Sequence, residues 1–111
     1  MKINQDYEGT TLDALEEAVT VNVADCDVIG FQITGTFTAT LAVEATMNGT
    51  DYVNFAITNV GTNSVASGFT VPCLLRSGYG TTYGIEKIRV RVSSYTSGSA
   101  LVIWQTARST K

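Results

Sequence analysis

The sequence contains no histidine, and this absence narrows the chemistry that the chain can perform. Histidine is the usual general base near neutral pH and the commonest ligand of transition metals, so Ser-His-Asp and Cys-His arrangements are excluded. Two cysteines, Cys26 and Cys73, are too few for a disulfide scaffold or a cysteine-rich zinc site. We expect two free thiols, with a single bridge as the alternative. We further expect no enzymatic activity and no cofactor.

Charged residues are also scarce, at 15% of 111 residues, and the formal net charge is -3. The chain therefore lacks the excess of lysine and arginine on which general nucleic-acid binding depends, and we expect no nucleic-acid partner. No apolar run approaches the roughly 20 residues that a membrane-spanning helix needs. The first residues also lack the apolar stretch of a signal peptide. We therefore expect a soluble protein with no membrane partner.

Threonine, serine, asparagine and glycine are plentiful instead, and they favour strands and tight turns. Apolar and polar residues alternate with a period of two, which predicts strands with one buried face. The alternating stretches are Val19–Val23, Ile29–Ala45, Tyr52–Thr58 and Lys87–Val92, and Phe69–Leu75 and Ala100–Ala107 fit further strands. Asn48-Gly49 is a strong hairpin signal. We divide Ile29–Ala45 near Gly35 into two strands joined by a tight turn, or interpret it as one bent and bulged strand.

These patterns predict an all-β fold with a single core. The best match is an antiparallel β-sandwich over residues 18–111, of jelly-roll or immunoglobulin-like type, with about seven or eight short strands. Residues 1–17 show no such alternation, and we expect an irregular N-terminal arm there. Within the arm, Thr10–Ala18 fits a short helix, because a threonine leads it, acidic residues come early, and Leu12 and Leu15 are three positions apart.

The charges are segregated along the chain and provide the first candidate interface. Acidic residues crowd the first quarter and basic residues come late. The interface residues that we select are Asp6, Glu8 and Asp13 on the acidic side and Lys87, Arg89 and Arg91 on the basic side. Period-two alternation places the three basic residues on one strand face. We expect this row to contact an acidic surface on a neighbouring copy or a partner, unless both sets are only solvated faces.

Aromatic residues provide the second candidate surface. Tyrosine and tryptophan combine an apolar face with a polar tip, and a flat array of them can stack against sugar rings. The candidates are Tyr52, Tyr79, Tyr83, Tyr95 and Trp104. The alternative, which we favour, is that Trp104 and Tyr52 fill the core or an interface between copies.

Three stretches together resemble a small β-sandwich module that recurs in bacteriophage virion proteins. They are FQITGTFTATLAVE over Phe31–Glu44, the Asn-Gly hairpin over Met47–Tyr52, and IEKIRVRVSSYTSGSA over Ile85–Ala100. Such modules occur in decoration proteins, head fibres and tail-associated proteins. The resemblance implies a non-enzymatic structural protein of the virion, assembled in the host cytoplasm.

Within that setting the resemblance implies two functions. The first is a capsid decoration or cement protein that binds the assembled head lattice as a homo-oligomer. Its partners would be the major capsid protein or other virion proteins, and its acidic arm would reach across to a neighbour. The alternative is a glycan-binding module of a tail or host-adsorption apparatus.

Overall fold

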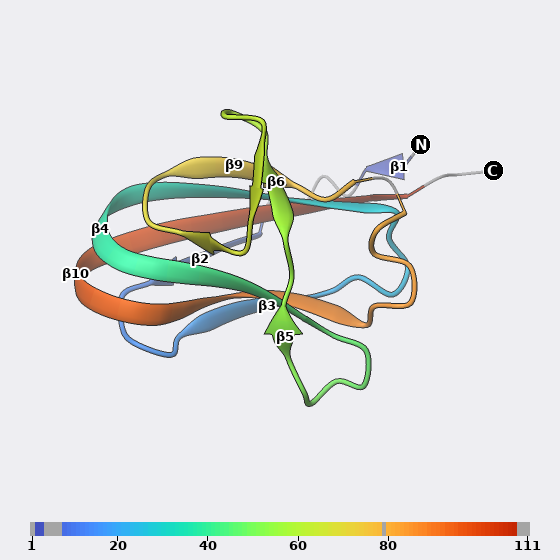
Figure 1. Cartoon of the computed structure of the whole chain (residues 1–111), viewed down its shortest axis with the longest axis horizontal. Helices are drawn as coiled ribbons and strands as arrows, with labels where there is room; N and C mark the ends of the chain where they lie inside the picture. Colours follow the sequence, from blue (N-terminus) through green and yellow to red (C-terminus); the bar gives the residue numbers. More distant parts are fainter. Residues whose placement is uncertain (1, 4–7, 79, 109–111) are drawn as a thin grey trace.

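The computed structural model describes residues 2–3, 8–78 and 80–108, and two long strands dominate it. β4 (Val28–Thr46) and β10 (Lys87–Arg108) pair in antiparallel fashion along almost their whole length. The ribbon they form bends back on itself at the left of Figure 1. Its upper layer contains residues 28–35 and 100–108, and its lower layer contains residues 41–46 and 87–92. Among the described residues there is no helix, and so none that is long and apolar enough to cross a membrane.

The bend has a clear local cause in bulges and glycines. The register between β4 and β10 shifts between Val92 and Ser94 and again between Tyr95 and Ser97, and such bulges bend strands and increase their twist. Gly35 and Gly98 have φ values of 108° and 86°, which favour glycine. The bent-strand alternative for Ile29–Ala45 is therefore the one observed. The prediction of separate strands over Lys87–Val92 and Ala100–Ala107 was wrong, because both lie in β10, which bends between them.

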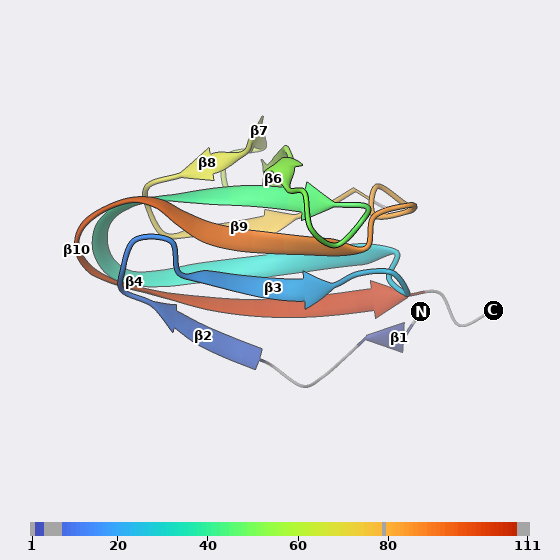
Figure 2. The same ribbon diagram turned by 90° about the horizontal axis from the view of Figure 1, so that it is seen from below.

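The N-terminal segment follows the outer edge of β10. β2 (Glu8–Leu12) pairs with the upper part of β10, β3 (Ala18–Asn22) pairs with the lower part, and β1 (Lys2–Ile3) pairs with its end. The turn between β2 and β3 crosses the bend (Figure 2).

The predicted helix over Thr10–Ala18 was therefore wrong. Leu12 is 2% exposed while Leu15 is 55% exposed, so the two leucines do not share one buried face. The arm was also expected to be irregular, but Glu8–Leu12 is a paired strand. Whether this segment also reaches a neighbouring copy stays a prediction.

The opposite edge of the ribbon carries the remaining strands. β9 (Cys73–Arg76), β6 (Ile57–Asn59) and β7 (Ser64–Ala66) extend the upper layer, and β5 (Val53–Asn54) and β8 (Gly68–Phe69) pair with the end of β4. All pairings between the described strands are antiparallel, so the prediction of an all-β antiparallel fold is confirmed. The jelly-roll or immunoglobulin-like type is not confirmed, because the ten described strands form one hydrogen-bonded sheet that bends back on itself.

The core lies between the two layers. Its fully buried side chains alternate along β4 and β10 as predicted, and they include Ile29, Phe31, Leu41, Val43, Ile88, Val90, Val92 and Val102. Burial of such apolar side chains from both layers is the main force that holds the bent ribbon closed. Cys26 and Cys73 are free and partly buried, as expected.

Candidate binding surfaces

The predicted basic row lies on the outer face of the lower layer, where two arginines share one glutamate. Alternation along β10 is as predicted, because Ile88 and Val90 point into the core. Arg89 Nε donates to Glu44 Oε1 at 2.8 Å, and Arg91 donates to both Glu44 oxygens through Nε and Nη2, each at 3.0 Å. The Glu44 side chain is only 9% exposed. Its charge is therefore satisfied mainly by these two guanidinium groups.

Each residue of the basic row also contacts another residue of this chain. Arg91 Nη1 donates to Glu16 Oε1 at 2.8 Å. The Arg89 guanidinium lies 3.7 Å from the centroid of the Tyr52 ring, which is a cation–π distance. Lys87 Nζ is 3.8 Å from Glu86 Oε1. An interface role for Lys87, Arg89 and Arg91 stays a prediction, but their charges already have partners in this chain.

We call Glu44, Arg89 and Arg91 together the Glu44 cluster. Its ion pairs predict that the fold is less stable in acid. Hydrogen bonds from Arg91, and secondarily from Arg89, hold the pKa of Glu44 below its ordinary value, although burial acts in the opposite direction. A depressed folded-state pKa stabilises the fold above the unfolded-state pKa, near 4.3 for glutamate, and this stabilisation is lost as the pH falls through the folded-state value. We expect the melting temperature, measured by calorimetry, to decrease as the pH is lowered below about 4.5.

A matched pair of variants assigns this acid sensitivity to the cluster. Glu44→Gln cannot titrate, so its melting temperature should depend less on pH than that of the parent protein. The exposed carboxyl of Asp25 serves as a control, and Asp25→Asn should keep the parental dependence. Parallel pH curves for Glu44→Gln and the parent would contradict the assignment.

The described candidate aromatics lie in different parts of the fold. Tyr52 stacks against Arg89 on the outer face of the lower layer. The Tyr83 hydroxyl donates to Asp27 Oδ1 at 3.0 Å, and the Tyr95 hydroxyl donates to the carbonyl of Gly98 in the bend. Trp104 is partly buried against the core. The structure therefore does not bring these four together, and Tyr79 lies outside the described residues.

The structure describes two of the three predicted acidic interface residues, Glu8 and Asp13. Asp13 is exposed in the turn between β2 and β3. Glu8 begins β2, where its backbone pairs with Trp104. Asp6 lies outside the described residues. No group of three or more Cys, Asp or Glu side chains that could hold a metal ion is found in the described ranges.

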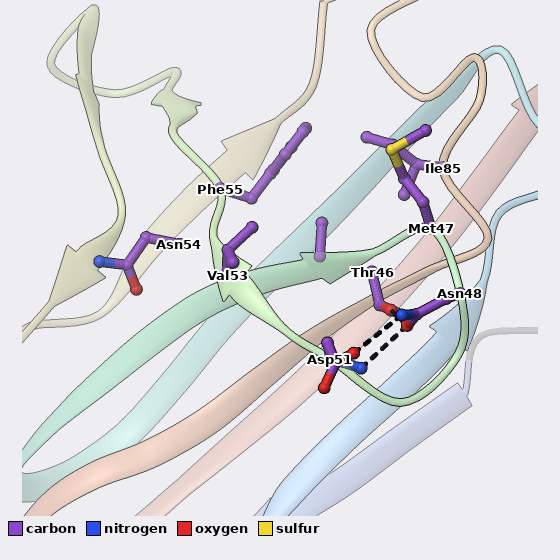
Figure 3. Close-up of a pocket in the computed structure, with 9 residues that line it drawn as sticks. Thr46, Met47, Asn48, Asp51, Val53, Asn54, Phe55 and Ile85 are labelled. Atoms are coloured by element: carbon purple, nitrogen blue, oxygen red, sulfur yellow. Dashed lines mark hydrogen bonds between the residues drawn. The ribbon is translucent and has the colours of Figure 1, made fainter.

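A hollow of about 320 Å³ lies beside the predicted Asn48-Gly49 turn (Figure 3), and we call it the turn hollow. The turn exists, and Gly49 has a φ of 86°, but the loop from β4 to β5 is longer than a two-residue hairpin. Apolar side chains surround the hollow in the close-up, and they belong to Met47, Val53, Phe55 and Ile85. Met47 and Val53 are largely exposed.

Three polar side chains around the turn hollow, those of Thr46, Asn48 and Asp51, are hydrogen-bonded to one another. Asn48 Nδ2 donates to Asp51 Oδ2 at 2.9 Å, and Thr46 Oγ1 donates to Asn48 Oδ1 at 3.0 Å. The backbone N–H of Asp51 also donates to Asn48 Oδ1. These bonds fix the loop and leave a mainly apolar wall, which suits an apolar side chain of a protein partner.

A second depression lies on the outer face of the upper layer, at Gly30. Two adjoining hollows of about 240 and 140 Å³ share Gly30, Leu74 and Gln105 in their walls, and together we call them the Gly30 furrow. Gly30 has no side chain to fill the space, and Leu74 is 50% exposed. Arg76 and Val60 line the larger hollow, and Ile103 lines the smaller one.

Sequence reasoning missed both hollows. The signal for the furrow was present at residues 101–104, where apolar residues occupy both strand faces. An apolar outer face was therefore predictable, but the identity of the strand beside it was not.

The whole chain has a structural counterpart but no recognised sequence family. No family model matches it, and no curated protein matches it by sequence. The fold resembles that of the SPBc2 prophage-derived protein YomS. The TM-score is 0.68 at 14% identity, over 94% of this chain and 97% of that one. At this identity the likeness shows the fold alone.

A second solved chain comes from the Bacillus endospore appendages, described as a family of disulfide-linked pili. It covers 96% of this chain and 89% of its own length at 10% identity. The TM-score is 0.42, which is too low to carry an argument about fold or function.

Proposed function

We propose that this chain is a non-enzymatic structural protein of a bacteriophage virion, and that it decorates the assembled capsid. The observation that carries the proposal is the likeness in fold to a prophage-derived protein over 94% of the chain. It agrees with the resemblance of Phe31–Glu44 and Ile85–Ala100 to a phage virion module. The proposed location is the virion, after assembly in the host cytoplasm.

The exposed apolar surfaces support a protein partner for this proposed role. Contiguous exposed apolar side chains mark protein interfaces more often than solvated faces do. The turn hollow combines the exposed Met47 and Val53 with a loop fixed by the Asn48 hydrogen bonds. A fixed apolar hollow loses little conformational entropy when a partner side chain enters it. We propose the major capsid protein as that partner.

Cosedimentation with purified heads of the parent phage tests this role. We expect near-stoichiometric binding to assembled heads and none to unassembled coat protein. Val53→Asp places a charge in the turn hollow and should weaken binding about tenfold or more. Val65→Asp, at an exposed site on β7, is the matched control and should bind as the parent does. A chain that stays in the supernatant with intact heads would refute capsid decoration.

A hydroxyl-lined hollow in the bend supports a second candidate, a glycan-binding module of the tail or host-adsorption apparatus. It measures about 320 Å³ and is lined by Phe37, Thr38, Ala39, Thr40, Thr70, Ser94 and Thr96. Hydroxyl groups both donate and accept hydrogen bonds, as sugar hydroxyls do. Binding to host-cell polysaccharide, with no binding to heads, would favour this candidate over decoration.

A further inference from the structure

The turn between β2 and β3 projects a leucine between acidic side chains, and we call residues 13–17 the acidic turn. Leu15 is exposed, and so are Asp13 and Glu17 on either side of it. Backbone hydrogen bonds from Glu16 N–H to Val92 O and from Val92 N–H to Glu17 O fix the turn on the bend. The projection is therefore preformed.

Two carboxyl groups of the acidic turn lie together. The backbone N–H of Asp13 donates to Glu17 Oε1 at 2.7 Å. The hydrogen bond that a protonated Asp13 carboxyl can donate to Glu17, together with the electrostatic repulsion between the two carboxylates, raises the pKa of Asp13. Glu16 differs from them because it pairs with Arg91. Among the described residues, neither Asp13 nor Glu17 lies within ion-pair distance of a lysine or arginine.

The Gly30 furrow offers the complementary chemistry on the opposite side of the ribbon. Arg76 lines it, is exposed, and forms no ion pair with any described acidic residue. Leu74 and Val60 form an apolar wall beside this guanidinium. Gly30 lies close to the start of β4 at Val28, whereas the acidic turn lies across the bend. The two surfaces are therefore separate on one molecule.

We propose that the acidic turn of one copy docks into the Gly30 furrow of a second copy, with Leu15 in the furrow and Asp13 and Glu17 facing Arg76. An apolar side chain fills the space left by Gly30, and opposite charges meet at its margin. Partial desolvation strengthens such a charge pair and sets the orientation of the partners. This self-association goes beyond attachment to a capsid and needs no capsid to be observed.

Each copy carries both surfaces, so two copies can dock reciprocally in a symmetric dimer, or further copies can add in a ring or an open chain. Sedimentation velocity of the purified chain up to about 1 mM should therefore show mass that rises with concentration to at least two copies. Added salt should reduce it, because the charges lie near solvent.

Variants that block one surface each provide the decisive test. Gly30→Val fills the furrow, since a Cβ at Gly30 meets only Leu75 O at 3.4 Å. Leu15→Ser removes the apolar projection. Each variant alone should be monomeric, with an association constant lowered about thirtyfold or more, which corresponds to the loss of a buried interfacial contact. Mixed together they should form a 1:1 dimer, because each keeps the surface that the other lacks.

Two further variants keep the test interpretable. Arg76→Glu reverses the furrow charge and replaces Gly30→Val if the latter fails to fold, as judged by circular dichroism. Val71→Ser alters an exposed apolar residue that lies in neither the acidic turn nor the Gly30 furrow, and this variant should associate as the parent does. A monomeric parent at all concentrations, or a mixture of the two blocked variants that stays monomeric, would overturn the proposal. A failure here leaves the capsid test unaffected, since that test scores binding to heads.

Discussion

Gly98→Ala is expected to destabilise the fold by about 3 kcal/mol or more, enough to lower the melting temperature by about 10 °C or to prevent folding. A Cβ at Gly98 would overlap the carbonyl oxygen of Thr36 and lie 2.6 Å from the Cα of Phe37. The neighbour is backbone and cannot rotate away. The φ of 86° adds the strain of a left-handed conformation.

A matched glycine separates the steric clash from the dihedral strain. Gly84 has a φ of 80°, but nothing lies within 4 Å of a Cβ built there. Gly84→Ala should therefore cost only about 1 to 2 kcal/mol. Thermal and urea unfolding of both variants measure the difference. Equal losses at the two positions would show that close approach of the strands at the bend is unimportant.

Glu44→Ala is expected to cost about 2 kcal/mol, since it leaves two guanidinium groups without their shared acceptor. The full cost of breaking a buried ion pair is reduced here, because the side chains of Arg89 and Arg91 are 27% and 21% exposed. Water can solvate part of each guanidinium after the change. Urea unfolding with an unchanged slope would report the loss as one of stability alone.

Lys87, in the basic row beside Glu44, is the matched control. Its ammonium is 3.8 Å from Glu86 and the two side chains are 36% and 41% exposed, so Lys87→Ala should change stability by no more than about 0.5 kcal/mol. If Glu44→Ala reduced stability as little as Lys87→Ala, the Glu44 cluster would be an incidental surface contact with little effect on stability.

Sequence periodicity predicted the inner faces of the strands well. Alternation placed Ile29, Phe31, Ile88 and Val90 in the core, because a period of two follows from strand geometry alone. The Asn-Gly signal also located the turn after β4. These features depend on residues close together in the chain, and local chemistry determines them.

Features that depend on contacts between residues far apart in the chain were harder to predict from the sequence. Glu44 and Arg91 are 47 positions apart, and nothing in the sequence says that one accepts hydrogen bonds from the other. The basic row was therefore predicted to be open to partners. Thr10–Ala18 was interpreted as a short helix from its local pattern, whereas the strand partners of Thr10–Leu12 lie 88 to 92 positions away in β10.

The position of β10 has a consequence for synthesis on the ribosome. β1, β2 and β3 all pair with β10, which comes last among the described strands. These three strands therefore have no native partner until β10 has emerged from the ribosome. Pairing over such sequence distances is slow and leaves unpaired strand edges exposed in the meantime. Folding of this sheet is therefore expected to wait for the synthesis of β10, and the nascent chain should depend on chaperones more than a domain built from sequential hairpins.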